Sequence, residues 1–178
     1  MKILRTNHLN VWFYNPDTDP SGLVNKLVAH CDGPFCHCEI QLADGMAASI
    51  YMHGTASMRL RKFSNPAYTC VRIPCHYSTH ARAADAMKTL VASEPEFSSR
   101  AMLGAYYGVN WCAEKHTFCS KLVADVLHAA RLFPEHIDTA TITPSGLHRL
   151  LTNASSPTHN TAPQACASGR VEAIGFKT

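Results

Sequence analysis

Apolar and polar residues alternate along several short stretches in the first half of the chain, as expected for β-strands that bury one face. In residues 35–42, one face carries His37, Glu39 and Gln41 and the other face is apolar. Similar stretches occur at residues 11–14, 46–53, 57–63 and 68–73. An Asp-Gly pair at residues 44–45 is typical of a hairpin turn. The middle third of the chain is therefore predicted to be an antiparallel meander.

Helical spacing of apolar residues replaces this alternation in the second half of the chain. The clearest case begins near residue 117, where Leu122, Val123 and Val126 belong to one apolar stripe. The predicted helices span residues 21–31, 81–92, 101–107, 117–131 and 146–151. Strands followed by helices indicate the α+β class, with a small antiparallel sheet, as a meander or partly open barrel, packed against the helices.

The length of 178 residues is enough for one domain with its own core and short for two. We expect a folded domain over residues 1–151 and a flexible segment, rich in Ser, Thr, Ala and Pro, over residues 152–170. Residues 171–178 are predicted to contain a C-terminal edge strand.

Composition excludes several classes of protein. Hydrophobic residues make up 46% of the chain and charged residues 16%, which argues against disorder throughout. A net charge of +3 is too mild to indicate nucleic-acid binding. No apolar run approaches the roughly 18 residues of a membrane span. The first eight residues lack the pattern of a signal peptide, so a cytoplasmic protein is expected.

The chain contains eight Cys and eleven His, which is a high number for its length and calls for an explanation. A framework of disulfides is disfavoured, because a reducing cytosol keeps thiols free. Structural zinc is a second alternative, with candidate ligands in residues 31–38 and 70–80, but neither spacing matches the usual zinc motifs. The remaining alternative is one reactive cysteine among cysteines that pack as small apolar residues.

Cys119 is the candidate for that reactive cysteine, since it lies in the first turn of the clearest helix. Unpaired N–H groups and the helix dipole favour an anion there, which lowers the pKa of a thiol. The backbone N–H of Cys119 can also supply half of an oxyanion hole. His37, on its predicted strand, is the candidate base. Packing of Cys119 as an inert core residue is the competing interpretation.

Four motifs in the same order resemble the circularly permuted papain-like proteins, a branch of the NlpC-type superfamily of cysteine amidases. Residues 37–45 resemble the strand that carries the family's histidine, and residues 104–108 resemble its Gly-x-x-Tyr segment. Residues 118–123 are similar to the start of its cysteine helix. Residues 142–147 resemble its Thr-Pro-x-x-Leu signature. Residues 119–132 are especially similar to poxvirus members of this branch.

The resemblance implies a permuted papain-like fold that places the start of the cysteine helix over the histidine. It further implies a thiol hydrolase or acyltransferase that attacks an amide or ester through a thioester on Cys119. Short peptides, acyl amides or lipids are the implied substrates, no cofactor or metal is needed, and the oligomeric state stays open. For a viral protein the location would be the host cytoplasm or virion. A catalytically silent interaction protein on the same fold is the alternative.

The residue that orients His37 is left open by the resemblance. In many relatives this group lies on the next strand, at the position of residues 48–50 here, where Ser49 is the one polar side chain. Glu39 lies two residues from His37 on the same face and is favoured, because a carboxylate best stabilises an imidazolium.

Three further side chains are weaker candidates. His53 shares a predicted strand face with Ser49 and could replace it as the orienting group. Tyr107 matches the family's Tyr, and either shapes the pocket, donates to the oxyanion or packs in the core. His116 lies three residues before Cys119, where an exposed loop position is expected.

Overall fold

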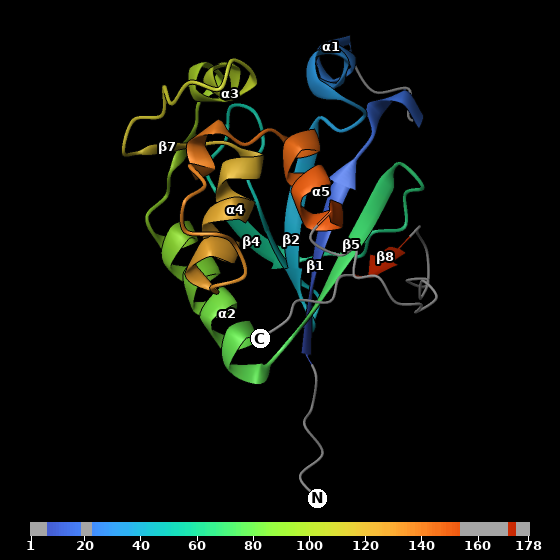
Figure 1. Ribbon diagram of the computed structural model, residues 1–178, viewed down its shortest axis with the longest axis vertical. Helices are drawn as coiled ribbons and strands as arrows, with labels where there is room; N and C mark the ends of the chain where they lie inside the picture. The colour runs from blue at the N-terminus through green and yellow to red at the C-terminus, as the bar shows by residue number, and fades with distance from the viewer. Residues whose placement is uncertain (1–6, 19–22, 154–170, 174–178) are drawn as a thin grey trace, which may run out of the picture.

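The computed structural model of the protein describes residues 7–18, 23–153 and 171–173 (Figure 1). Its main feature is a six-stranded sheet with the strand order β4-β3-β2-β1-β5-β8. The strands are β1 (Asn7–Tyr14), β2 (His37–Leu42), β3 (Met46–Ser49), β4 (Ser57–Leu60), β5 (Tyr68–Cys75) and β8 (Val171–Ala173). The first five strands pair in antiparallel fashion, and β8 lies parallel to β5 at the edge.

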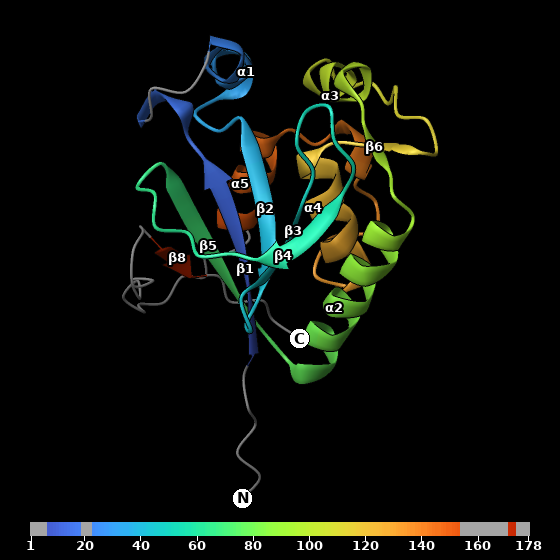
Figure 2. The same cartoon turned by 180° about the vertical axis from the view of Figure 1, so that it is seen from behind.

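Helices α2, α4 and α5 cover one face of this sheet, as Figures 1 and 2 show from opposite sides. The α-helices are α1 (Leu23–Asp32), α2 (Tyr77–Ala92), α3 (Ser99–Tyr106), α4 (Cys119–Ala129) and α5 (Pro144–Asn153). Short 3-10 turns form at Pro16–Thr18 and Thr139–Thr141, and β6 (Glu96–Phe97) pairs with β7 (His116–Thr117). The predicted α+β class, with an antiparallel sheet packed against helices, is confirmed.

The core lies between α4 and the strands. Side chains at alternate positions of β1 and β2, among them Val11, Phe13 and Ile40, are fully buried against Leu122 and Val126 of α4. Each buried aliphatic or aromatic side chain contributes about 1.5–3 kcal/mol by leaving water. This packing fixes α4 against β2, and with it the relative position of their first residues.

Two predictions about the strands are corrected by the structure. The expected meander stops at β4, because β5 pairs with β1 instead of β4. The strand expected over residues 46–53 ends at Ser49. A turn follows, in which the N–H of Gly54 donates to the carbonyl of Tyr51 and His53 adopts a positive φ of 64°.

The segment 61–67 covers the sheet face opposite the helices, because it must cross from β4 at one edge to β5. Phe63 stacks on Trp12 with 4.4 Å between ring centroids. The side chain of Gln41 donates to the carbonyl of Arg61 over 2.9 Å and accepts from the Trp12 indole over 2.8 Å. These contacts hold Arg61 against the sheet face on which His37 and Glu39 lie.

The predicted flexible segment 152–170 and the C-terminal strand lie largely outside the described residues. Residues 152–153 belong to the end of α5, and Val171–Ala173 forms β8. No helix in the described ranges combines the length and apolar character that crossing a membrane requires.

Candidate active site

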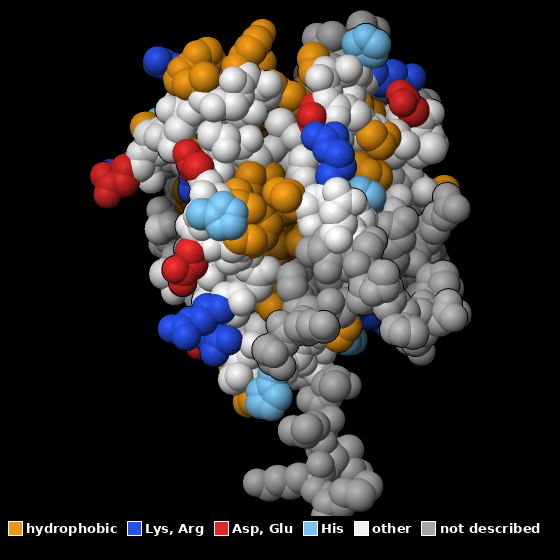
Figure 3. Space-filling model, viewed as in Figure 1, with side chains coloured by type: hydrophobic (Ala, Val, Ile, Leu, Met, Phe, Trp, Pro, Cys, Tyr) orange, Lys and Arg blue, Asp and Glu red, His pale blue; other side chains and the backbone are white. Residues whose placement is uncertain are grey.

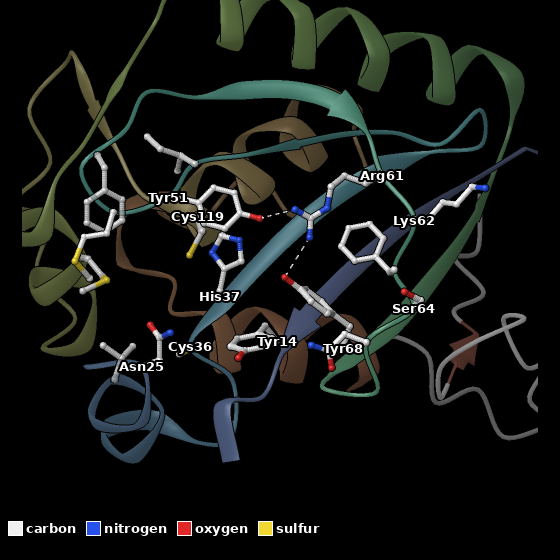
Figure 4. A pocket seen from close by; sticks show the side chains of 17 residues that line it. Tyr14, Asn25, Cys36, His37, Tyr51, Arg61, Lys62, Ser64, Tyr68 and Cys119 are labelled. Atoms are coloured by element: carbon white, nitrogen blue, oxygen red, sulfur yellow. Dashed lines mark hydrogen bonds between the residues drawn. The ribbon is translucent and has the colours of Figure 1, made fainter. Parts of the chain in front are cut away.

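His37 and Cys119 come together where β2 and α4 both begin. His37 is the first residue of β2 and Cys119 is the first residue of α4. Both side chains line the same cleft, and Figure 4 shows the Cys119 sulfur beside the imidazole ring. Cys119 is buried, with 3% of its surface exposed, while 14% of the His37 side chain reaches solvent. Cys119 and His37, the predicted nucleophile and base, are thus in contact although they lie 82 positions apart in the sequence.

The surroundings of Cys119 favour its thiolate. A hydrogen bond from the Cys38 thiol is the strongest cause that holds the pKa of Cys119 well below its ordinary value, and His37 and the backbone N–H of Cys38 lower it further against the effect of burial. Phe118, at the N-cap of α4, makes no side-chain cap hydrogen bond. The N–H groups of the first turn are therefore left for an anion at Cys119.

His37 is held as an imidazolium by the same arrangement. Burial alone would lower the pKa of His37, but its interactions with Cys119 and with the Glu39 carboxylate raise it to about 9. At neutral pH the pair is therefore a thiolate and an imidazolium, the form in which a cysteine attacks a carbonyl.

Ser49 and Glu39 both approach the same ring nitrogen of His37. The Ser49 hydroxyl lies 3.1 Å from Nε2, within hydrogen-bond distance. The Oε1 atom of Glu39 lies 3.7 Å from Nε2, as an ion pair and not a short hydrogen bond. The two candidates thus have separate roles: Ser49 accepts the Nε2–H, and Glu39 supplies negative charge.

Sequence reasoning did not find three residues that surround Glu39. The Tyr51 hydroxyl donates to Glu39 Oε1 over 2.7 Å, and the Arg61 guanidinium approaches the same oxygen at 3.0 Å. The Tyr68 hydroxyl lies 3.4 Å from it. The Tyr51 ring also stacks on His37, with centroids 4.6 Å apart. Tyr51 and Arg61 fall within the strands predicted over residues 46–53 and 57–63, but these strands end at Ser49 and Leu60, and the two side chains lie in the irregular segments that follow.

The dyad opens into a cleft of about 640 Å³, large enough for a small organic molecule or a short peptide segment. Part of its wall is apolar and comes from β6 and α3, through Phe97 and Met102. Another part is polar and comes from the segment after β4, through Lys62, Ser64 and Asn65. Figure 4 shows His37 and Cys119 among these lining side chains.

The three weaker candidates are not brought to the dyad. His53 is exposed and does not line the cleft, because β3 ends at Ser49 and the strand face on which His53 was expected does not continue. Tyr107 is 75% exposed at the end of α3, where its ring lies 6.4 Å from that of Trp111. Apolar side chains gather at this end of the molecule over α3 (Figure 3). His116 lies on β7, half-buried, and does not line the cleft.

Six cysteines in the described ranges are free thiols: Cys31, Cys36, Cys38, Cys75, Cys112 and Cys119. Cys36 lines the cleft beside Cys119, but burial raises its pKa to about 12, so it stays protonated at neutral pH. Cys38 is fully buried, and burial raises its pKa as well. Within the residues that the structure describes, no cluster of three or more His, Cys, Asp or Glu side chains is arranged to hold a metal ion.

Comparisons with protein-family models, with curated proteins and with solved structures find no match for this chain.

Proposed function

We propose that the protein is a thiol-dependent hydrolase or acyltransferase, in which Cys119 attacks an amide or ester carbonyl and His37 handles the proton. The observation that carries the proposal is the contact between Cys119 and His37 in a cleft, with Ser49 and Glu39 on the far side of the imidazole. A nucleophile, its base and an orienting group in this order are the parts that covalent acyl transfer needs.

The reaction begins with attack of the Cys119 thiolate on the carbonyl carbon, which places a negative charge on the carbonyl oxygen. Backbone N–H groups in the first turn of α4, including that of Cys119, lie where they can stabilise this oxyanion. The His37 imidazolium then protonates the leaving amine or alcohol, and a Cys119 thioester remains. Water or another acceptor, deprotonated by His37, attacks the thioester and releases the acyl group.

The cleft supports substrates that combine apolar and polar parts. Phe97 and Met102 offer an apolar wall, whereas Ser64 and Asn65 offer hydrogen-bonding groups. Short peptides, acyl amides and lipids each have this character, and we propose them as the substrate classes to test.

The fold itself supports a permuted papain-like architecture. In the chain the histidine strand precedes the cysteine helix, which is the order of the permuted branch, and α4 begins over His37. Membership of that family is part of the proposal and rests on the four ordered motifs together with this arrangement.

Labelling with a thiol-reactive acyl probe at pH 7, read by mass spectrometry of the modified peptide, tests the proposal. We expect label on Cys119, loss of that label in Cys119→Ala, and at least about a tenfold slower reaction in His37→Ala, because the thiolate loses its imidazolium partner. Cys36→Ala is the matched control, since Cys36 lines the same cleft but stays protonated, and it should leave the labelling rate unchanged.

Turnover separates an enzyme from a catalytically silent protein on the same fold. A panel of fluorogenic amides and esters should yield at least one substrate whose hydrolysis or transfer requires both Cys119 and His37. Equal labelling of wild type and His37→Ala, or label on cysteines other than Cys119, would contradict the dyad and favour the interaction protein.

A further inference from the structure

Glu39 is a buried carboxylate whose charge has to be maintained by its neighbours. It is 1% exposed, and an isolated carboxylate at such a site takes up a proton instead of staying charged. A protonated Glu39 would offer no negative charge to His37. The arrangement around this carboxyl group therefore decides whether it can assist the dyad.

Groups from four elements face the carboxyl group. His37 lies beside it on β2, at 3.7 Å, and Cys119 acts on it through His37. Tyr51 comes from the turn after β3, at 2.7 Å. Arg61 comes from the segment after β4, at 3.0 Å, and Tyr68 comes from β5, at 3.4 Å. The residue opposite Glu39 on β1 is the uncharged Trp12.

Arg61 and Tyr51 are also tied to each other. Nη1 of Arg61 donates to the Tyr51 hydroxyl over 2.9 Å (Figure 4), and that hydroxyl donates its own proton to Glu39. Nη2 of the same guanidinium forms an ion pair with Glu39 at 3.0 Å and donates to the Tyr68 hydroxyl over 3.4 Å. The backbone of Arg61 is anchored in turn by Gln41 of β2. The guanidinium is thus fixed in one orientation, with 22% of its side chain exposed.

We propose that Arg61 and Tyr51 are positioning residues that keep the buried Glu39 carboxylate ionised and aimed at Nε2 of His37. The inference rests on the proposed function, because it assigns these residues to the same dyad. Arg61 supplies the compensating charge. Tyr51 supplies the shortest hydrogen bond, and its ring, stacked on His37, fixes the plane of the imidazole.

The consequence for the dyad follows from the charges. An ionised Glu39 stabilises the His37 imidazolium, which in turn stabilises the Cys119 thiolate. Without Arg61 or the Tyr51 hydroxyl, Glu39 takes up a proton at a higher pH and this support is lost. When the pH is lowered, the Cys119 thiolate of such a variant then takes up its proton at a higher pH than the thiolate of the wild-type protein does.

Alkylation of Cys119 by iodoacetamide between pH 5 and 9 measures that thiolate fraction without any substrate. We expect Arg61→Gln to move the acid limb of the profile upward by about one pKa unit, so that alkylation slows by up to about tenfold at pH values on that limb. Arg61→Lys keeps the charge and should recover most of the rate. Tyr51→Phe keeps the ring and should show a smaller loss in the same direction.

A double-mutant cycle tests whether Arg61 and Tyr51 act through Glu39. In a Glu39→Gln background, neither Arg61→Gln nor Tyr51→Phe should change the alkylation rate by more than about twofold. Arg59→Gln is the matched control, since Arg59 lies on β4 close to Arg61 but its guanidinium faces the Tyr51 ring, 5.4 Å from its centroid, and not Glu39. Equal losses in both backgrounds, or an equal loss in the control, would overturn the proposal.

Titration of the Glu39 carboxyl carbon by NMR keeps this inference separate from the proposed function. The wild-type carboxyl should titrate below its ordinary pKa, and Arg61→Gln should raise that pKa. An unchanged Glu39 pKa, with Cys119 still reactive, overturns the positioning role alone. A Cys119 that never reacts overturns the proposed function. If Arg61→Gln does not fold, Tyr51→Phe and its double variant with Glu39→Gln decide the same question.

Discussion

The Cys119 thiol owes its character to three different kinds of partner. The Cys38 thiol and backbone N–H donate to its sulfur, His37 faces it as a cation, and the uncapped start of α4 adds the helix dipole. His37 is polarised from its other side by Ser49 and Glu39. The proposed reactivity of this thiol therefore depends on the pattern of charges and donors around the sulfur and not on one residue type.

Different pH profiles are expected for alkylation and for turnover. Alkylation needs only the thiolate, so its rate should rise with pH and then stay constant. Turnover also needs the His37 proton for the leaving group, so it should fall again near pH 9, where the raised pKa of His37 lies. Parallel rate measurements from pH 5 to 10 check this. A turnover rate that stays constant above pH 9 would contradict the acid role of His37.

At the scale of elements, much of the site follows from periodicity in the sequence. Alternation along β2 placed His37 and Glu39 on one face, and the apolar stripe of α4 placed Cys119 at a helix start. Tyr51 and Arg61 were missed because the strands predicted over residues 46–53 and 57–63 end at Ser49 and Leu60, so the strand faces predicted for these two side chains do not form. The pairing of β5 with β1 was missed because strand order depends on long-range contacts, which local alternation does not encode.

Ser120 anchors the start of α4 and should be important for stability. Its buried hydroxyl donates to the carbonyl of Ile142 over 2.7 Å. Ser120→Ala leaves that carbonyl without its donor and should lower the free energy of unfolding by about 1–2 kcal/mol. Urea denaturation measures the change. Ser99→Ala, at an exposed first-turn position of α3, is the control and should stay within about 0.5 kcal/mol of wild type. Equal losses in the two variants would contradict the anchoring role.

At the scale of the whole molecule, folding couples to protons through the dyad. Below the ordinary His pKa of 6.5, the unfolded chain binds one proton on His37 and one on Cys119, whose ordinary pKa is 9.0. The folded thiolate–imidazolium pair binds only one. Between pH 6.5 and about 9 both states bind one proton, so the contributions of the two residues to stability cancel.

Stability should therefore fall on the acid side. The free energy of unfolding is expected to decrease below pH 6.5, by at most about 1.4 kcal/mol per pH unit from this pair, and to be flat between pH 6.5 and 8.5. Urea denaturation at pH 5.0, 6.0, 7.0 and 8.0 tests the expectation. Cys119→Ala removes the group that loses its proton on folding, so its profile should be flatter between pH 5 and 6.5. Identical slopes for the two proteins would show that Cys119 carries no folding-linked thiolate.

Because His37 lies on β2 and Cys119 lies on α4, the two side chains meet only when the helix is docked on the sheet. The sheet that carries the base is complete, apart from β8, by residue 75, whereas the nucleophile arrives on a helix that begins at residue 119. Docking of α4 is thus required before Cys119 meets its partners, and secondary structure alone does not create a reactive thiol. The alkylation rate of one side chain thereby reports native tertiary docking, and it can follow refolding or partial opening in real time.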